Sequence, residues 1–335
     1  MKRLLLYLSF AALAHAQGPR GADLGEADLP LGEPGIVWYP ELAQGLAEAK
    51  RSNKPILFMA VASQCNGISG VFRPGYTATQ NREFSDKKII EATRQFVCIR
   101  IDSYGSEENQ KIVRSYLNGR FANTAFCMLA PDGKERLTRG GRSPGQIFGR
   151  SANLADELNR IAKDYRAKEM KTPAPMPDFG TFRLALNIAS GDQRVLVLQA
   201  GTDEKATANL TAVAASPPIL GRFHYDLEKD ADMWSEVIEG EKSTKGILLI
   251  NPDPFGQKGT VISQLPLSAS RQEITKALQE ANAKFIATTE KKSYSEHVKK
   301  GRRAGIHFEM PVEFGEDRDG DGVIDERRGG RRRKK

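Results

Sequence analysis

Short apolar runs alternate with amphipathic segments along the first half of the chain. The apolar run at residues 56–62 is bounded by turn residues, which predicts a strand buried on both faces of a sheet, and residues 96–102 and 125–130 predict two further strands. Apolar residues recurring every three or four positions predict four helices, and Ser85 is placed to cap the second of them. This order of helices and strands is typical of an α/β domain. The four helices carry Leu42, Leu46 and Ala49; Ile89, Ile90 and Thr93; Ile112, Val113, Tyr116 and Leu117; and Leu154, Leu158, Ile161 and Tyr165.

A similar alternation returns in the second half of the chain, after a proline-rich stretch. Residues 171–180, KTPAPMPDFG, predict an extended linker. Beyond it the pattern predicts a strand, a helix, three strands of which the last two pair as a hairpin, and a helix opened by a capping box of Ser270 and Glu273. The order predicts a second α/β unit. Its strands are expected at 195–198, 223–226, 246–250 and 260–262, and its helices carry Leu210 and Val213, and Ile274, Ala277, Leu278 and Ala281.

The amino-terminal residues have the pattern of an export signal. Lys2 and Arg3 precede an apolar stretch, and Ala14-His15-Ala16 is a small-residue cleavage site before Gln17. The apolar stretch is too short to span a bilayer, and no later stretch is long enough. We therefore expect export to the periplasm or the extracellular space, where disulfides persist. The expected segments are a signal peptide (1–16), a flexible leader (17–36), a first domain (37–166), the linker (167–180), a second domain (181–287) and a polar tail (288–335).

The formal net charge of +8 belongs to the two ends of the chain. The signal carries two positive charges and residues 327–335 carry seven, which leaves a net charge of −1 for residues 17–326. The basic end predicts either a disordered, solvated tail or a contact with an anionic surface such as lipid headgroups. Because an exported protein meets little nucleic acid, we do not expect nucleic acid as a partner.

Cys65 directly follows the first apolar run, at the carboxyl end of a predicted buried strand. Open α/β sheets usually place their chemistry at this edge. The arrangement resembles the thioredoxin-like family, in which a Cys-X-X-Cys loop joins the first buried strand to a helix. The resemblance implies a thioredoxin-like fold for residues 37–166, with Ile68 at the position of the second cysteine. It is carried by Trp38, Ala49-Lys50, Asn53-Lys54-Pro55-Ile56-Leu57, Cys65, Phe84-Ser85-Asp86, Phe96-Val97, Ile101-Asp102 and Pro131-Asp132-Gly133.

The resemblance implies a loop that has lost part of the family's redox chemistry. A helix start would lower the pKa of Cys65, but the loop lacks the second thiol that resolves a mixed disulfide. Met59 occupies the place of the family's buried acid, and Thr124 that of its cis-proline. Three roles stay open for Cys65: a dithiol-type oxidoreductase, a monothiol that forms mixed disulfides, or a cysteine without catalytic function. Cys98 and Cys127 fall inside predicted strands, where thiols are usually inert.

The second unit resembles a degenerate copy of the same fold. The segment Gln199-Ala200-Gly201-Thr202-Asp203 stands where the cysteine loop would lie, and it contains no thiol. The expected fold class is therefore α/β, with a thioredoxin-like domain, a second degenerate thioredoxin-like unit and a disordered basic tail.

Residues 317–325, DRDGDGVID, have the pattern of a calcium loop. Carboxylates stand at positions 1, 3 and 5, and a glycine at position 6 makes the sharp turn; position 7 offers a backbone carbonyl and position 9 a carboxylate. The loop resembles that of an EF-hand, although Arg328 replaces the glutamate expected at position 12. It predicts either a weak Ca²⁺ site, with a dissociation constant of about 10⁻⁴–10⁻³ M, or an acidic, solvated turn. The expected ligands are Asp317, Asp319, Asp321, Val323 and Asp325.

Together these patterns predict an exported thioredoxin-like protein that lacks a dithiol site. We expect a binding or scaffold role toward a protein partner in the cell envelope, with Ca²⁺ bound near the end of the chain. The alternative is a monothiol disulfide oxidoreductase that uses Cys65. His224, His297 and His307 have no metal-ligand spacing with any cysteine, and no Ser-His-Asp or phosphate-binding pattern stands out.

Overall fold

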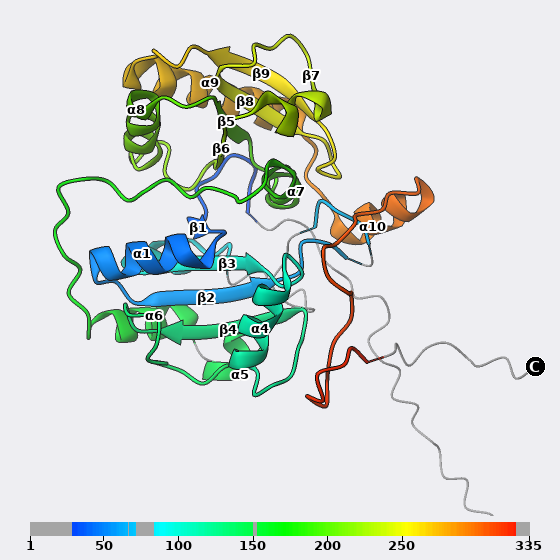
Figure 1. Ribbon diagram of the computed structural model, residues 1–335. Helices are drawn as coiled ribbons and strands as arrows, with labels where there is room; N and C mark the ends of the chain where they lie inside the picture. Colours follow the sequence, from blue (N-terminus) through cyan, green and yellow to red (C-terminus); the bar gives the residue numbers. More distant parts are fainter. Residues whose placement is uncertain (1–28, 66, 72–83, 150–152, 326–335) are drawn as a thin grey trace, which may run out of the picture.

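The computed structural model describes residues 29–65, 67–71, 84–149 and 153–325, and it contains two α/β domains, one above the other in Figure 1. The strands of the first domain are β1 (Trp38–Tyr39), β2 (Ile56–Val61), β3 (Val97–Asp102) and β4 (Thr124–Leu129). They form one sheet in the order β1-β3-β2-β4. The central strand β2 runs parallel to β3 and antiparallel to β4, so that Phe58 lies between Ile99 and Cys127. The three strands predicted from apolar runs are confirmed, and their order is that of a thioredoxin-like sheet.

Helices cover both faces of this sheet. They are α1 (Leu42–Ser52), α3 (Lys87–Ala92), α4 (Glu107–Tyr116), α5 (Pro144–Phe148) and α6 (Leu154–Ala162), with a 3₁₀ helix η1 (Thr93–Gln95). Successive residues of a strand point to opposite faces, and Phe58 accordingly packs in a core with α1 and α4, whereas Leu57 and Met59 pack in one with α3 and α6. Every residue of β2 is buried. Burial on both faces explains why this run is continuously apolar.

The second domain repeats the arrangement of the first around its own central strand. Its strands are β5 (Leu196–Ala200), β6 (His224–Glu228), β7 (Ile238–Glu239), β8 (Gly246–Pro252) and β9 (Gly259–Leu265). The sheet has the order β6-β5-β8-β9-β7, with β5 parallel to β6 and antiparallel to β8, as β2 is to β3 and β4. β8 and β9 form the predicted antiparallel hairpin. The helices are α7 (Phe182–Asp192), α8 (Glu204–Ala214) and α9 (Arg271–Thr288), with 3₁₀ helices η2 (Ala231–Met233) and η3 (Ser235–Val237).

Two helix caps show how far local patterns determine the helix starts. The capping box of Ser270 and Glu273 is present at the start of α9. Helix α3 is capped by Asp86 and not, as expected, by Ser85. The Asp86 carboxylate accepts hydrogen bonds from the backbone N–H groups of Lys88 and Ile89, at 2.8 and 3.3 Å. A carboxylate suits this place because it also meets the positive end of the helix dipole.

Helix α7 lies between the two sheets and joins them into one core (Figure 1). Its buried side chains share a hydrophobic cluster with β2 of the first domain and with β5 and β8 of the second. At its end, Asp192 accepts hydrogen bonds from Arg100 of β3, at 2.5 and 3.3 Å, and its Oδ2 lies 2.9 Å from Nε2 of His224 of β6. Burial alone would raise the pKa of Asp192, but Arg100 and His224 hold it well below its usual range. The domains are thus joined by apolar packing and by a buried ion pair.

The proline-rich linker is held by both domains. Gln44 of α1 bonds the backbone of Asp178 twice, at 2.8 and 3.1 Å. The Asp178 carboxylate accepts from the N–H of Leu227 in β6 at 2.9 Å and faces the carboxyl of Asp226. Burial and the neighbouring carboxylates raise the pKa of Asp226 to about 9 and that of Asp178 to about 6. Residues 175–180 therefore act as a bound connector rather than a free spacer.

The end of the expected flexible leader also packs against the second domain. Ile36 is buried, and the N–H of Gly35 donates to the carbonyl of Gly221 at 2.9 Å. The carbonyl of Gly32 accepts from Arg222. The expectation of a flexible leader is therefore wrong for residues 29–36. The expected signal peptide, 1–16, lies outside the described residues.

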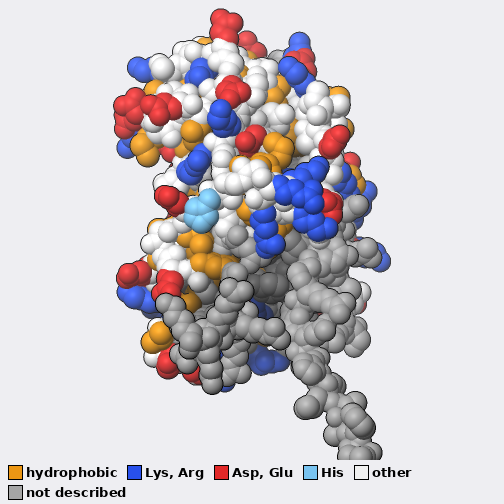
Figure 2. Space-filling view, turned by 90° about the vertical axis from the view of Figure 1, so that its right-hand side faces the viewer, with side chains coloured by type: hydrophobic (Ala, Val, Ile, Leu, Met, Phe, Trp, Pro, Cys, Tyr) orange, Lys and Arg blue, Asp and Glu red, His pale blue; other side chains and the backbone are white. Residues whose placement is uncertain are grey.

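The expected polar tail contains a further helix, α10 (Tyr294–Arg303), which packs against both domains. Its buried face carries Tyr294 and Val298, which contact Ile68 and Val71. The sequence analysis did not predict this helix, because its few buried residues stand among many charged ones. Figure 2 shows Lys and Arg side chains gathered at the height of this helix. Its exposed basic residues are Lys299, Lys300, Arg302 and Arg303.

After α10 the chain runs along the first domain (Figure 1, red). Met310, Val312 and Phe314 stand at every second position and pack on the core of that domain. The hydroxyl of Tyr104 donates to the carbonyl of Gly315 at 2.7 Å. Residues 288–325 are thus ordered against the fold, contrary to a free tail, whereas the basic end, 326–335, lies outside the described residues. In the described part of the chain, no helix has the length and apolarity needed to cross a membrane.

Candidate functional site

Cys65 lies in a tight turn at the carboxyl end of β2. Its backbone N–H donates to the carbonyl of Ile68 at 2.9 Å, and the N–H of Ile68 donates back at 3.1 Å. The thiol side chain is half-buried. The expected helix start after Cys65 does not occur in residues 67–71, and residues 72–83 lie outside the described part of the chain. The placement at the sheet edge agrees with the sequence, but the described residues provide no helix dipole for the thiol.

Ile68, which stands where the family resemblance places a second cysteine, makes an apolar contact with α10. Ile68 is 2 % exposed and packs with Tyr294 and Val298 of α10, and Cys65 and Phe255 border the same cluster. The approach of α10 is close, because a Cβ placed on Gly301 would lie 2.5 Å from Ile68 and 2.9 Å from Phe255. In this fold, residue 68 therefore serves to dock the helix.

Two polar side chains fix the loop that follows Ile68. The ammonium group of Lys292 donates to the carbonyls of Gly70, Ser190 and Pro254 at 2.9, 2.9 and 2.7 Å. Burial lowers the pKa of Lys292 to about 7. The ring of His297 places Nε2 2.8 Å from the carbonyl of Ser69, and burial lowers its pKa to about 4. These contacts of Lys292 and His297 were not predictable from a local pattern, since Lys292 stands among other charged residues.

A buried acid does lie at this edge of the sheet, but on the neighbouring strand. Asp102, the last residue of β3, pairs in register with Val61 of β2. Its carboxylate accepts hydrogen bonds from the hydroxyl of Ser63 at 2.6 Å and from the N–H of Tyr104 at 3.0 Å. Burial raises the pKa of Asp102. Met59, at the place where the family resemblance puts an acid, is buried in the apolar core.

The two other thiols are part of the core. Cys98 and Cys127 lie in β3 and β4, 3 % and 0 % exposed, and no disulfide joins them to each other or to Cys65. Burial raises the pKa of Cys98 to about 12 and also raises that of Cys127. Neither is placed to resolve a mixed disulfide on Cys65.

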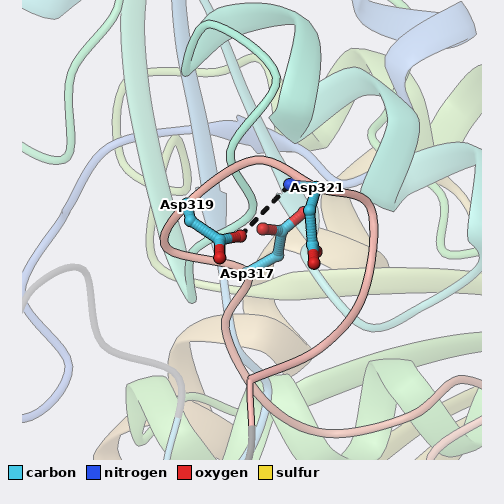
Figure 3. A group of neighbouring side chains, drawn as sticks. All are labelled: Asp317, Asp319 and Asp321. Atoms are coloured by element: carbon cyan, nitrogen blue, oxygen red, sulfur yellow. Dashed lines mark hydrogen bonds between the residues drawn. The ribbon is translucent and has the colours of Figure 1, made fainter.

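The acidic loop brings three of its five expected ligands together. Figure 3 shows the side chains of Asp317, Asp319 and Asp321 turned toward one another, and one ligand atom from each lies within 4.8 Å of the others. The turn is made by Gly320 and Gly322, both with positive φ. The N–H of Asp321 donates to the Asp319 carboxylate at 3.2 Å. The three side-chain ligand atoms are all carboxylate oxygens, which suits a hard cation such as Ca²⁺.

Asp317 anchors the loop to the first domain. Its carboxylate is fully buried and accepts from the N–H groups of Gly320 and Gly322, at 2.7 and 3.0 Å, and from Arg114 of α4. Burial opposes its ionisation, but these donors hold its pKa below the usual range. Its backbone pairs with Phe121 in both directions, at 2.9 and 3.0 Å. One expected ligand is therefore also a structural ion-pair partner.

The remaining two expected ligands are the backbone carbonyl of Val323 and the carboxylate of Asp325. Val323 is exposed, and its N–H donates to the Asp321 carboxylate at 2.8 Å. The Asp325 carboxylate accepts from the N–H of Arg318 at 2.7 Å and so closes the loop on itself. Arg328 lies outside the described residues. The carboxylates at positions 1, 3 and 5 fit a cation.

No protein-family model matches the chain, and no curated protein matches it. Among solved structures it is similar to form I of human ERp44, with 12% identity and a TM-score of 0.23 over 74% of this chain and 56% of that one. It is also similar to the zinc-bound form of human ERp44, with 12% identity and a TM-score of 0.25 over 73% and 60%. It is similar as well to form II of ERdj5, with 8% identity and a TM-score of 0.24 over 76% of this chain and 30% of that one. The chain thus spans little more than half of the ERp44 chains, and at these TM-scores the likeness carries no inference on function.

Proposed function

We propose that this is an exported binding protein of thioredoxin-like fold whose carboxyl-terminal loop holds Ca²⁺. The observation that carries the proposal is the group of three carboxylates, Asp317, Asp319 and Asp321, with ligand atoms within 4.8 Å of one another. Ca²⁺ takes about six to eight oxygen ligands on a flexible loop. The backbone carbonyl of Val323 and the carboxylate of Asp325 would add to the set, and water would supply the rest.

Calcium in this loop would have a structural role rather than a catalytic one. Asp317 already pairs with Phe121 of the first domain, so a cation that rigidifies residues 317–325 also strengthens the docking of the segment after α10. Because position 12 has no acid, we expect weak binding, with a dissociation constant of about 10⁻⁴–10⁻³ M. Such an affinity suits the calcium levels outside the cell.

Calorimetric titration of the full chain with CaCl₂ tests this proposal. We expect a single weak site, lost in the double variant Asp319→Asn/Asp321→Asn, which leaves the buried Asp317 and the fold untouched. The matched control is Glu107→Gln/Glu108→Gln, which removes two exposed acids elsewhere. Equal heats for the wild type and the loop variant would end the calcium claim.

We propose that the protein binds a protein partner in the cell envelope rather than catalysing thiol exchange. The support is the loop itself, in which Ile68 holds α10 in the place of a resolving thiol. The exposed basic face of α10 and the basic end of the chain suit an anionic surface nearby. Export is tested by the amino terminus of the protein recovered from the periplasm or medium, expected at Gln17; a full-length cytoplasmic protein contradicts it.

The second candidate is a monothiol oxidoreductase that uses Cys65. It is favoured by the half-buried thiol at the carboxyl end of a central strand, where it takes part in no disulfide. Its test is the rate of alkylation as a function of pH, with Cys65→Ser as the control for the buried thiols. A thiol pKa near the ordinary value of about 8.5 counts against it, whereas insulin reduction that disappears in Cys65→Ser would establish it and end the scaffold proposal.

A further inference from the structure

A cavity lies where the linker passes between the two domains. Its walls come from β1, from residues 174–177 of the linker, and from α8 and β6. The volume open to the centre of a water molecule is about 60 Å³, so the cavity has room for more than one water. Most of its lining is apolar. The large side chains around it are those of Trp38, Met176, Leu220 and Phe223.

A buried guanidinium group stands in this apolar wall. Arg194 is 9 % exposed, its Nε has no hydrogen-bond partner among the described residues, and its Nη1 reaches only the carbonyl of Ile36, at 3.4 Å. The charges that act on it are one carboxylate, Asp192, and two guanidinium groups, Arg100 and Arg94. Asp192 is itself engaged by Arg100 and His224. The wall of the cavity thus carries an excess of positive charge.

A second unused donor lines the same cavity. Tyr225 is 5 % exposed, and its hydroxyl has no partner within the described part of the chain. None of the described residues that line the cavity is acidic. A buried donor left unpaired costs about 1–3 kcal/mol, and more if it is charged, so two of them in one wall call for an acceptor.

We infer that this cavity binds a small carboxylic acid with a compact apolar body. The carboxylate would accept hydrogen bonds from Arg194 and Tyr225, since a guanidinium group binds carboxylates in a fixed, forked geometry. The branched or aromatic body would lie against Trp38, Met176 and Phe223. A neutral or cationic molecule of the same shape would leave the guanidinium group unpaired. The site is independent of both the acidic loop and Cys65, and it lies at the joint that holds the two domains together.

Binding of benzoate to the full chain, followed by calorimetry and by Trp38 fluorescence, tests the inference. Benzoate combines a carboxylate with a compact aromatic body, and we expect a dissociation constant on the order of 0.1–1 mM. Benzyl alcohol and benzylamine are the neutral and cationic controls, and both are expected to bind at least about tenfold more weakly. Benzoate binding no tighter than that of benzyl alcohol would overturn the inference.

Two variants locate the site. Tyr225→Phe removes only the hydroxyl and is expected to weaken benzoate binding about threefold to tenfold. Arg194→Met removes the charge, for an expected loss of at least about tenfold. Arg160→Met, on an exposed face of α6, is the matched control and is expected to bind as the wild type does. Because Arg194→Met alters a buried position, circular dichroism must first show a folded variant; if it is not folded, Tyr225→Phe decides. Unchanged affinity in Tyr225→Phe, or a crystal structure in benzoate with only water in the cavity, would refute the assignment.

Discussion

Arg114 of α4 donates to the carboxylate of Asp317, 203 residues later in the sequence, and that carboxylate is fully buried. The same guanidinium group also reaches the carbonyls of Gly119 and Gly322, at 3.2 and 3.3 Å. Arg114 therefore serves as the counter-ion of the acidic loop and as its tether to the first domain. Any cation that enters the loop must share Asp317 with this arginine, which couples calcium binding to the docking of the carboxyl-terminal segment.

Arg114→Met is expected to raise the calcium affinity and lower the stability of the calcium-free protein. Without Arg114, the oxygens of Asp317 are open to the cation, and we expect the dissociation constant to fall about threefold to tenfold. In chelator, the loss of a hydrogen bond to a charged group should lower the free energy of unfolding by about 1.5–3 kcal/mol. Calorimetry and urea unfolding measure the two effects.

The exposed Arg120, close to Gly320 of the loop, provides the control for net charge. Arg120→Met removes a positive charge from the same surface without touching Asp317, and we expect a change in affinity of less than about twofold. Calcium affinities that are equal in Arg114→Met and Arg120→Met would mean that the ion pair does not compete with the cation.

The strands could be predicted because each is buried on both faces, which makes β2 a continuous apolar run and β3 and β4 mostly apolar. Burial on both faces, however, does not reveal how the two domains are joined. Leu57 and Met59 share a core with α7, and no local pattern says which element will cover a strand face. Sequence reasoning therefore found two α/β units but not their common core.

The candidate sites were predictable to the extent that they are local. The acidic loop is a spacing pattern within nine residues, and three of its carboxylates do converge. The pairing of Asp317 with Arg114 and Phe121 joins distant segments, so it left no trace in the local pattern. For the same reason the sequence placed Cys65 at a sheet edge but did not show that α10 packs beside it.

Asp226→Asn should stabilise the protein, and increasingly so as the pH rises. Burial, Asp178 and Glu228 raise the pKa of Asp226 to about 9, so the native state keeps a proton that the unfolded chain loses near pH 4. The unfolded state then binds fewer protons than the native state between these values, and stability falls with rising pH. An asparagine amide can donate to Asp178 at every pH. We expect a gain on the order of 3 kcal/mol near pH 8 relative to pH 4.

Urea unfolding of the wild type and variant across this pH range measures the effect. Two further acids face Asp178 and Asp226 and also raise their pKa values: Glu228, on the strand of Asp226, and Glu41, the residue before α1. Asp230→Asn, an exposed acid at the end of the same segment, is the control and should leave the slope unchanged. A wild-type pH slope that persists in Asp226→Asn would show that the proton resides elsewhere.

Lys292→Met should remove a pH dependence of opposite sign. Burial lowers the pKa of Lys292 to about 7, against about 10.5 for the free side chain. Between these values the unfolded chain binds more protons than the native protein, so this lysine makes stability rise with pH. The variant also removes the lysine hydrogen bonds to the carbonyls of Gly70, Ser190 and Pro254, at a cost of about 1–3 kcal/mol at all pH values.

The comparison is again made by urea unfolding, now between about pH 7 and pH 10. Lys300→Met removes an exposed lysine from α10 and should keep the wild-type slope. Combined with Asp226→Asn, the lysine variant should give a nearly flat profile, because both titrating groups are then removed. In the wild type the two groups act in opposite directions from about pH 7 to pH 9, so each single variant exposes the slope of the other group. A slope that is the same in the wild type and Lys292→Met would place the titrating group at another residue.

Gly70→Ala should destabilise the protein far more than the strain of a positive φ alone would, because it also disturbs the docking of α10. Gly70 has a φ of +71°, and a Cβ there would lie 2.3 Å from the carbonyl oxygen of Pro254 and 3.1 Å from Nε2 of His297. Gly119 has a φ of +87° with nothing within 4 Å, so Gly119→Ala measures the backbone strain by itself. We expect the free energy of unfolding to fall by about 1 kcal/mol for Gly119→Ala and by about 3 kcal/mol for Gly70→Ala, because a backbone oxygen must move.

Hydrogen exchange distinguishes the two variants further. Only Gly70→Ala should speed exchange in α10, since the loop at Gly70 and the hydrogen bonds of Lys292 hold that helix. Equal losses of stability, with α10 equally protected in both variants, would mean that this loop does not hold the helix.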